Sequence, residues 1–116
     1  METGSNILDL EIKQGQDEEL IITVQNADGT PVNITGYTFA GQVRDTFLGS
    51  LIFPFSFEIQ DQVTNTGEVK MTVAAAVTRK IRINQPTTYV YDVEMYSPKE
   101  TRVIEGKILL TPEVTK

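Results

Sequence analysis

Residues 88–96, Thr-Tyr-Val-Tyr-Asp-Val-Glu-Met-Tyr, alternate between two kinds of side chain. One parity is apolar or aromatic throughout: Tyr89, Tyr91, Val93 and Met95. The opposite parity includes Asp92 and Glu94. A period of two is typical of a β-strand with one buried face and one wet face. The stretch therefore predicts a strand whose apolar side faces a core.

The same pattern recurs along the chain, because short runs rich in Val, Ile, Thr, Tyr and Phe alternate with turn signals. We expect strands within 8–13, 20–24, 37–44, 47–59, 68–74, 88–96 and 101–111. Residues 74–83 have enough helical propensity for one or two turns. This spacing predicts an all-β, immunoglobulin-like β-sandwich of about seven antiparallel strands with at most one short helical turn. At 116 residues, 1–116 form a single domain, with flexible tails at 1–6 and 112–116.

Two strands contain residues that carry a more local prediction. Gly41 lies between Phe39 and Val43 on an apolar parity, which predicts the close approach of a neighbouring side chain or a bulge. Tyr89 and Tyr91 have the spacing of core aromatics, which favours burial over stacking on a sugar or base. Burial of this kind places a tyrosine hydroxyl within reach of the backbone, as in a tyrosine corner.

Composition excludes several classes of function. The net charge is -6 with only 10 Lys and Arg, so no basic face is expected for nucleic acid, and the small cluster Arg79, Lys80 and Arg82 is interpreted as a solvated turn. The chain has no cysteine and no histidine, which removes disulfides, Cys-His and Ser-His-Asp catalysis, and the usual metal ligands. We therefore expect no enzyme, no cofactor, no metal and no small-molecule substrate.

Targeting signals are also absent from the sequence. Residues 1–6 lack a basic stretch followed by an apolar core, and no apolar run approaches membrane-spanning length. We expect a soluble protein made in the cytoplasm.

Two acidic stretches resemble sites only superficially. Asp17, Glu18 and Glu19 adjoin along one strand entrance and are interpreted as a solvated turn, because catalytic carboxylates face each other across a cleft. Residues 26–29 suggest part of a calcium loop, but that alignment places Val24 at the first ligand position and Thr35 where a bidentate Glu is required.

One segment departs from alternation. Around Phe53-Pro54-Phe55 both parities are apolar, so an isolated domain would leave some of this surface exposed. The candidate protein interface consists of Phe47, Leu51, Phe53, Phe55 and Phe57. The alternative is that the segment folds back and covers the edge of the sandwich as core. Pro54 cannot donate to a sheet ladder, which predicts an edge strand or a bulge.

Several fragments together resemble small immunoglobulin-like structural proteins of tailed bacteriophages. The fragments are Ile12-Lys13-Gln14-Gly15, the run Asp28-Gly29-Thr30-Pro31-Val32-Asn33-Ile34-Thr35-Gly36-Tyr37, Gln42-Val43-Arg44, Tyr91-Asp92-Val93-Glu94 and Glu105-Gly106-Lys107-Ile108. The N-terminal domain of phage baseplate upper proteins is similar in the order of these pieces, and the likeness covers nearly the whole chain.

This resemblance implies a non-enzymatic virion component, located in a tail, baseplate, neck or capsid. Its partners would be other virion proteins and further copies of itself, with no nucleic acid and no membrane involved. Baseplate proteins continue into receptor-binding domains, whereas this sequence ends at Lys116, which favours an adaptor, completion or decoration role. The alternative is a carbohydrate-binding module that uses Tyr37 or Tyr96 as a stacking platform.

Overall fold

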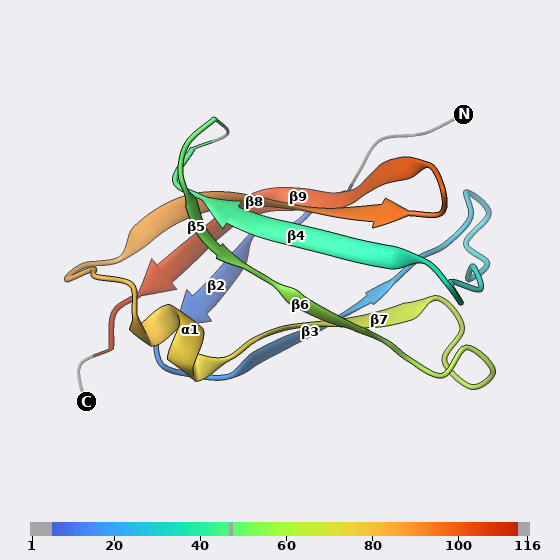
Figure 1. The fold of residues 1–116 in the computed structure, drawn as a ribbon, viewed down its shortest axis with the longest axis horizontal. Helices are drawn as coiled ribbons and strands as arrows, with labels where there is room; N and C mark the ends of the chain where they lie inside the picture. The colour runs from blue at the N-terminus through green and yellow to red at the C-terminus, as the bar shows by residue number, and fades with distance from the viewer. Residues whose placement is uncertain (1–5, 47, 114–116) are drawn as a thin grey trace.

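The alternating stretch forms most of β8 (Thr87–Tyr96), a strand that lies between β9 and β4 in a six-stranded sheet (Figure 1). A second sheet of three strands, in the order β3-β7-β6, packs against it. The computed structural model describes residues 6–46 and 48–113. The predicted all-β sandwich is therefore confirmed.

The described part of the chain contains nine strands and one helix. They are β1 (Asn6–Ile7), β2 (Leu10–Lys13), β3 (Glu18–Thr23), β4 (Thr38–Arg44), β5 (Leu51–Pro54), β6 (Ser56–Ile59), β7 (Glu68–Val73), α1 (Ala75–Arg79), β8 (Thr87–Tyr96) and β9 (Glu100–Thr111). The single helix agrees with the one or two turns predicted within 74–83.

The strand count and direction correct the prediction in detail. One of the seven expected runs, 47–59, is divided in two because the chain changes sheets at Phe55, and an additional strand, β1, precedes the first expected run, 8–13. All pairings are antiparallel except those of β1 and β2, which run parallel to β9 along the same edge. A period of two defines the face of a strand but not the direction of its neighbour.

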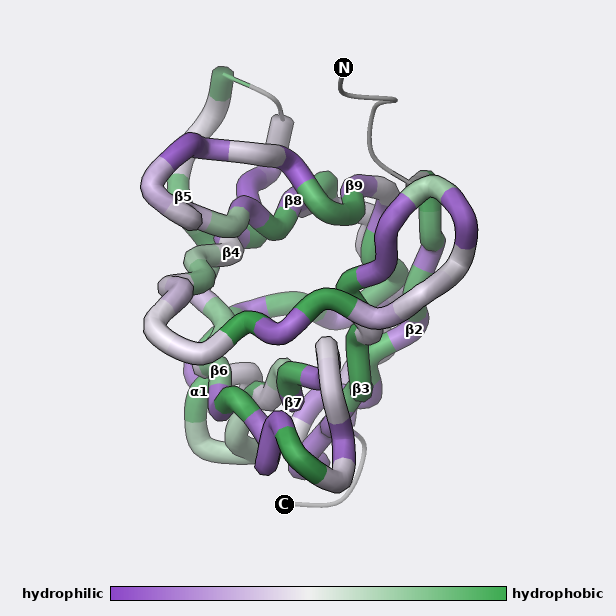
Figure 2. The backbone as a smooth tube through the Cα atoms, turned by 90° about the vertical axis from the view of Figure 1, so that its right-hand side faces the viewer, coloured by the Kyte–Doolittle hydropathy of each residue, from purple (hydrophilic) through white to green (hydrophobic). Residues whose placement is uncertain are grey.

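Figure 2 shows the two sheets as layers, with β4, β8 and β9 above β6, β7 and β3. The core lies between them and draws side chains from both. Its fully buried members include Val43 and Val93 from the six-stranded sheet and Val69 from the three-stranded sheet. The helix closes one end of this core, because Thr78 is buried and the side chain of Gln14 donates hydrogen bonds to the carbonyls of Thr78 and Ile81 at 3.1 and 2.6 Å. The Thr78 carbonyl also accepts the Ile81 amide at 3.0 Å, so the Gln14 side chain ties the end of the helix and the turn that follows it to the β2–β3 turn.

The ends of the described chain belong to the fold more fully than the predicted tails imply. Asn6 pairs with Ile104 in β1, and the amide of Glu113 donates to the side-chain oxygen of Gln14 at 2.9 Å. Glu113 also forms an ion pair with Arg79 at 3.2 Å. Residues 1–5 and 114–116 of the predicted tails lie outside the described residues.

Candidate interaction surfaces

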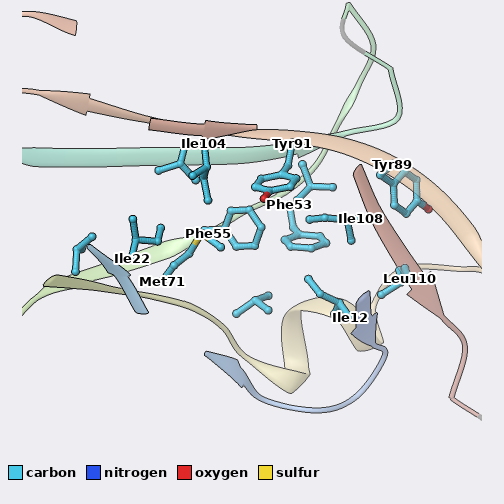
Figure 3. Packing of buried hydrophobic residues seen from close by; sticks show 14 of the residues in the cluster. Ile12, Ile22, Phe53, Phe55, Met71, Tyr89, Tyr91, Ile104, Ile108 and Leu110 are labelled. Carbon is cyan, nitrogen blue, oxygen red and sulfur yellow. The ribbon is translucent and has the colours of Figure 1, made fainter. Parts of the chain in front are cut away.

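Two residues of the predicted interface, Phe53 and Phe55, lie in the core of the sandwich (Figure 3). Their exposed fractions are 3% and 8%. Their rings meet edge to face at 5.7 Å, and Phe55 makes a similar contact with Tyr91 at 5.9 Å. The expectation that this ring pair docks on a partner is wrong, because both rings are covered by the chain itself.

The run is apolar on both parities because the chain crosses from one sheet to the other. β5 is the edge of the six-stranded sheet and β6 the edge of the three-stranded sheet, so Phe55 between them faces the core. A register shift opposite Val43 and Arg44 leaves Ile52 as an extra residue in β5, which turns part of the second parity inward. Pro54 lies on this edge strand, as predicted.

Phe57 is half-buried rather than free. Its ring lies 5.9 Å from that of Phe39, and both pack against the core. A Cβ atom at Gly41 would lie 3.0 Å from Phe57 and 3.1 Å from Phe55, so the glycine provides the space that these two rings occupy. The predicted close approach at Gly41 is confirmed.

Leu51 is the member of the predicted interface that the structure leaves exposed, and it follows the β4–β5 loop, whose described residues are 45, 46 and 48–50. The side chain of Leu48 is 100% exposed and that of Leu51 is 47% exposed. Figure 1 shows this loop projecting beyond the two sheets. Phe47, the remaining predicted residue, lies outside the described residues.

Hydrogen bonds join the two ends of the β4–β5 loop. The Asp45 carboxylate accepts the amides of Thr46 and Ser50 at 2.7 and 2.8 Å, and the Arg44 guanidinium donates to the Gly49 carbonyl at 2.9 Å. A Cβ atom at Gly49 would overlap the Asp45 carboxylate, so only glycine allows this arrangement. These contacts hold residues 44–46, 49 and 50 together, and the side chain of Leu48 lies in solvent beside them.

A second surface is a depression of about 350 Å³ on the outer face of the six-stranded sheet. Its polar lining consists of Gln42, Arg44, Asp92, Glu94, Arg102 and Glu105. Arg102 forms ion pairs with Asp92 at 3.6 Å and with Glu105 at 3.4 Å. The sequence interpretation did not identify this site. Most of its polar side chains occupy the outward parity of predicted strands, but Arg102 reaches this face because a register shift leaves Val103 as an extra residue in β9.

The tyrosine pair belongs to the core, as predicted, and its two members differ. Tyr91 donates its hydroxyl to the Leu8 carbonyl at 2.6 Å, which confirms the expected contact with backbone. Burial, with a smaller effect from the negative charge of Asp9, raises the pKa of Tyr91 to about 12. Burial, followed by the charge of Asp45, also raises the pKa of Tyr89.

The acidic turn residues have structural roles. Asp17 accepts the amide of Ala75 at 2.7 Å, and Glu18 accepts the amide of Lys13 at 3.3 Å. Hydrogen bonds from the side chain and then the backbone of Thr30 lower the pKa of Asp28. Among the residues described, no group of three or more potential ligands is placed to hold a metal ion.

The described residues also contain no helix of the length and apolarity that a membrane crossing requires.

No family model matches this sequence, and no curated protein matches it. A solved structure of a family 123 glycoside hydrolase from Clostridium perfringens, described for glycolipid glycan hydrolysis, is similar with a TM-score of 0.42 and 11% identity. The similarity covers 96% of this chain and 24% of the hydrolase chain, so this chain spans about a quarter of that protein. A likeness at this level carries no argument about function.

Proposed function

We propose that this chain is a non-enzymatic structural component of a bacteriophage virion, and that it assembles through the β4–β5 loop and Leu51. The observation that carries the proposal is the full exposure of Leu48 on a loop fixed by Asp45 and Arg44. A large apolar side chain that stays in solvent contributes no free energy of burial in the free protein, whereas its burial against a partner is favourable.

The hydrogen bonds between the two ends of the loop favour a docking role over a merely tolerated surface leucine. Ordering a flexible loop on binding costs free energy, and a loop already held by hydrogen bonds avoids much of that cost. The second exposed side chain, Leu51, extends the apolar surface where the loop joins β5.

The placement in a virion is supported by the sequence resemblance to small phage structural proteins. The Asp28-Gly29 fragment forms a turn in which Gly29 has a φ of +92°, and Gly36 has a φ of +83°. Both glycines therefore occupy positions that other residues adopt at a cost. The resemblance implies a symmetric assembly, and the proposed partner of the loop is another copy or a neighbouring virion protein.

Light scattering of the purified protein across a wide range of concentration tests the role of the loop. We expect masses above that of the monomer at high concentration, and we expect Leu48→Ser to weaken self-association about 10- to 100-fold, from the loss of one buried leucine. Val63→Ser is the matched control, because Val63 is 90% exposed on a different loop. A monomer at every concentration, or equal weakening by both substitutions, would contradict self-assembly through this loop.

Mass spectrometry of phage particles purified from a strain that carries this sequence tests the placement. The chain should be present in several copies per particle after a high-salt wash. Its absence from intact particles would refute the virion assignment.

A second candidate, a carbohydrate-binding module, is favoured by the depression on the six-stranded sheet. Its Arg, Gln, Asp and Glu side chains offer the donors and acceptors that sugar hydroxyls require. Tyr96 is 51% exposed and extends from the same outer face, where it pairs with Thr38. Glycan-array binding that is lost in both Tyr96→Ala and Arg102→Ala would establish this candidate over the first.

A further inference from the structure

The two sides of the sandwich differ in how their strand edges end. On one side, β5 continues into β6, so a single segment of chain links both sheets. On the other side, β2 and β3 each form an edge and are not paired with one another. One residue, Phe55, separates β5 from β6 on the first side, which we call the closed side, and four residues, 14–17, separate β2 from β3 on the second, which we call the open side.

The closed side carries the features by which proteins protect a sheet edge. Its strands are four residues each, Pro54 has no amide to offer, and Ile52 forms a bulge. β3 has six residues, Glu18–Thr23, and contains no proline, lysine or register shift. Its free edge is therefore suited to pairing with another strand.

The orientation of β3 identifies the amides that are available. Val24, which continues the strand, donates its amide to the Gly67 carbonyl at 2.8 Å, on the β7 side. Because amides alternate in direction along a strand, those of Thr23, Ile21 and Glu19 point away from β7. Within residues 6–46 and 48–113, no strand pairs with β3 on that side.

The open side also contains an apolar groove of about 80 Å³ between β2 and β3. Its apolar lining consists of Leu10, Ile12, Leu20, Phe55, Met71 and Val73. Leu10 and Leu20 are only half-buried, and Ile21 on the outer face of β3 is 47% exposed. Alternate side chains of an added strand would cover the groove and contact Ile21 on its outer face.

The rim of the groove is acidic. Glu11, Glu18 and Glu19 line it, and in the described part of the chain the carboxylates of Glu11 and Glu19 have neither an ion-pair partner nor a hydrogen bond. An incoming strand with basic side chains would be attracted by this rim. A second copy of the chain would instead bring the same carboxylates to the contact, in a protein of net charge -6.

We propose that the free edge of β3 binds an extended segment of a partner protein in which basic and apolar side chains alternate, and that this segment pairs as a fourth strand of the smaller sheet. The amides of Ile21 and Thr23 provide backbone pairing, the groove takes the apolar side chains, and Glu11 and Glu19 contact the basic ones. This surface is distinct from the β4–β5 loop, so either proposal can fail without the other.

The test uses the full chain and a labelled synthetic peptide of about eight residues with alternating Lys and Val, a length suited to an added strand. Binding is measured by fluorescence anisotropy, and its position by NMR. We expect the largest shifts at the amides of Glu19, Ile21 and Thr23. Raising the salt concentration should weaken binding, as should Glu11→Gln with Glu19→Gln, and a Glu-Val peptide of the same length should not bind.

The decisive variant is Ile21→Pro, which removes an outward amide while leaving the β7 pairing in place, with circular dichroism to confirm the fold. We expect at least a 10-fold loss of peptide affinity, whereas Ile21→Thr, which keeps the amide, should lose less. If Ile21→Pro does not fold, Thr23→Pro removes another outward amide and replaces it.

Three results would overturn the proposal. They are undiminished binding by the folded proline variant, NMR shifts centred away from β3, and no binding of the Lys-Val peptide at millimolar concentration. Self-association without peptide that Ile21→Pro abolishes would also overturn it, because a second copy would then fill the edge.

Discussion

Replacing Tyr91 by Phe removes a single hydroxyl that connects three parts of the fold. The hydroxyl donates to the Leu8 carbonyl at 2.6 Å, in the gap between β1 and β2. Tyr91 pairs directly with Gly106 on β9, and a Cβ atom at Gly106 would overlap that same carbonyl. The glycine therefore allows the Leu8 carbonyl to approach the sheet where Tyr91 meets it.

The expected destabilisation follows from the hydrogen bond and the burial of its donor. Tyr91 is 3% exposed, so its ring packing should be kept by Phe while the hydrogen bond is lost. A net hydrogen bond contributes about 1 kcal/mol, and a buried acceptor left without a partner costs about 1–3 kcal/mol. We expect a loss of about 1.5 kcal/mol in the free energy of unfolding, equivalent to a fall of about 6 °C in Tm for a chain of this length.

Urea unfolding followed by circular dichroism measures this difference, with Tyr89→Phe as the matched control. Tyr89 is also buried, but its hydroxyl makes no hydrogen bond to a described protein group, and the described residues leave no buried side-chain polar atom unpaired. Its loss should therefore change stability by less than about 0.5 kcal/mol. Equal effects of the two substitutions would refute the assignment of stability to the contact between Tyr91 and Leu8.

Three further predictions follow from the same contacts. The pKa of Tyr91 is about 12 in the folded protein against 10.0 for an unperturbed tyrosine, so its contribution to stability is complete below pH 10 and is lost as the pH rises through 12. The free energy of unfolding, taken from unfolding curves across this range, should therefore depend less on pH in Tyr91→Phe than in the wild type. Phe53→Ser combined with Phe55→Ser should abolish folding, because each truncation of a buried ring costs about 3–5 kcal/mol against a total stability of about 5–15 kcal/mol. A double variant that circular dichroism shows to be folded would contradict the assignment of both rings to the core. Gly106→Ala should lower the free energy of unfolding by about 1–3 kcal/mol, because the added Cβ atom displaces the Leu8 carbonyl. If urea unfolding gives the variant the same stability as the wild type, the segment that contains Leu8 can shift without cost and the prediction is wrong.

The strands could be predicted because alternation reports directly which residues face a core. Tyr89, Tyr91 and Val93 are all buried, as their shared parity indicates. The parallel pairing of β2 with β9 could not be predicted in the same way, because it joins residues nearly a hundred positions apart. Local periodicity carries no information about which distant strand becomes the neighbour.

The candidate interface shows where sequence pattern becomes ambiguous. An apolar run on both parities is expected for a surface that a partner covers, and equally for a strand that is buried by its own chain. Here Phe53 and Phe55 belong to the second class, while Leu48 and Leu51 of the same run stay exposed. The β4–β5 loop depends on the side chain of Asp45 folding over Gly49, a contact that composition does not reveal.

The chain crosses between the sheets at Phe55, so β6 follows directly from β5 on one side of the molecule. The other edge of the smaller sheet is β3, which is longer than β6, with six residues against four. Evolution commonly protects such an edge with lysine, proline or a bulge, yet β3 has glutamates at its start and an exposed Ile21 at its centre. Glutamates repel a second copy of this acidic chain but attract a basic strand, so the edge is protected against self-aggregation and remains open to one chemical class of partner.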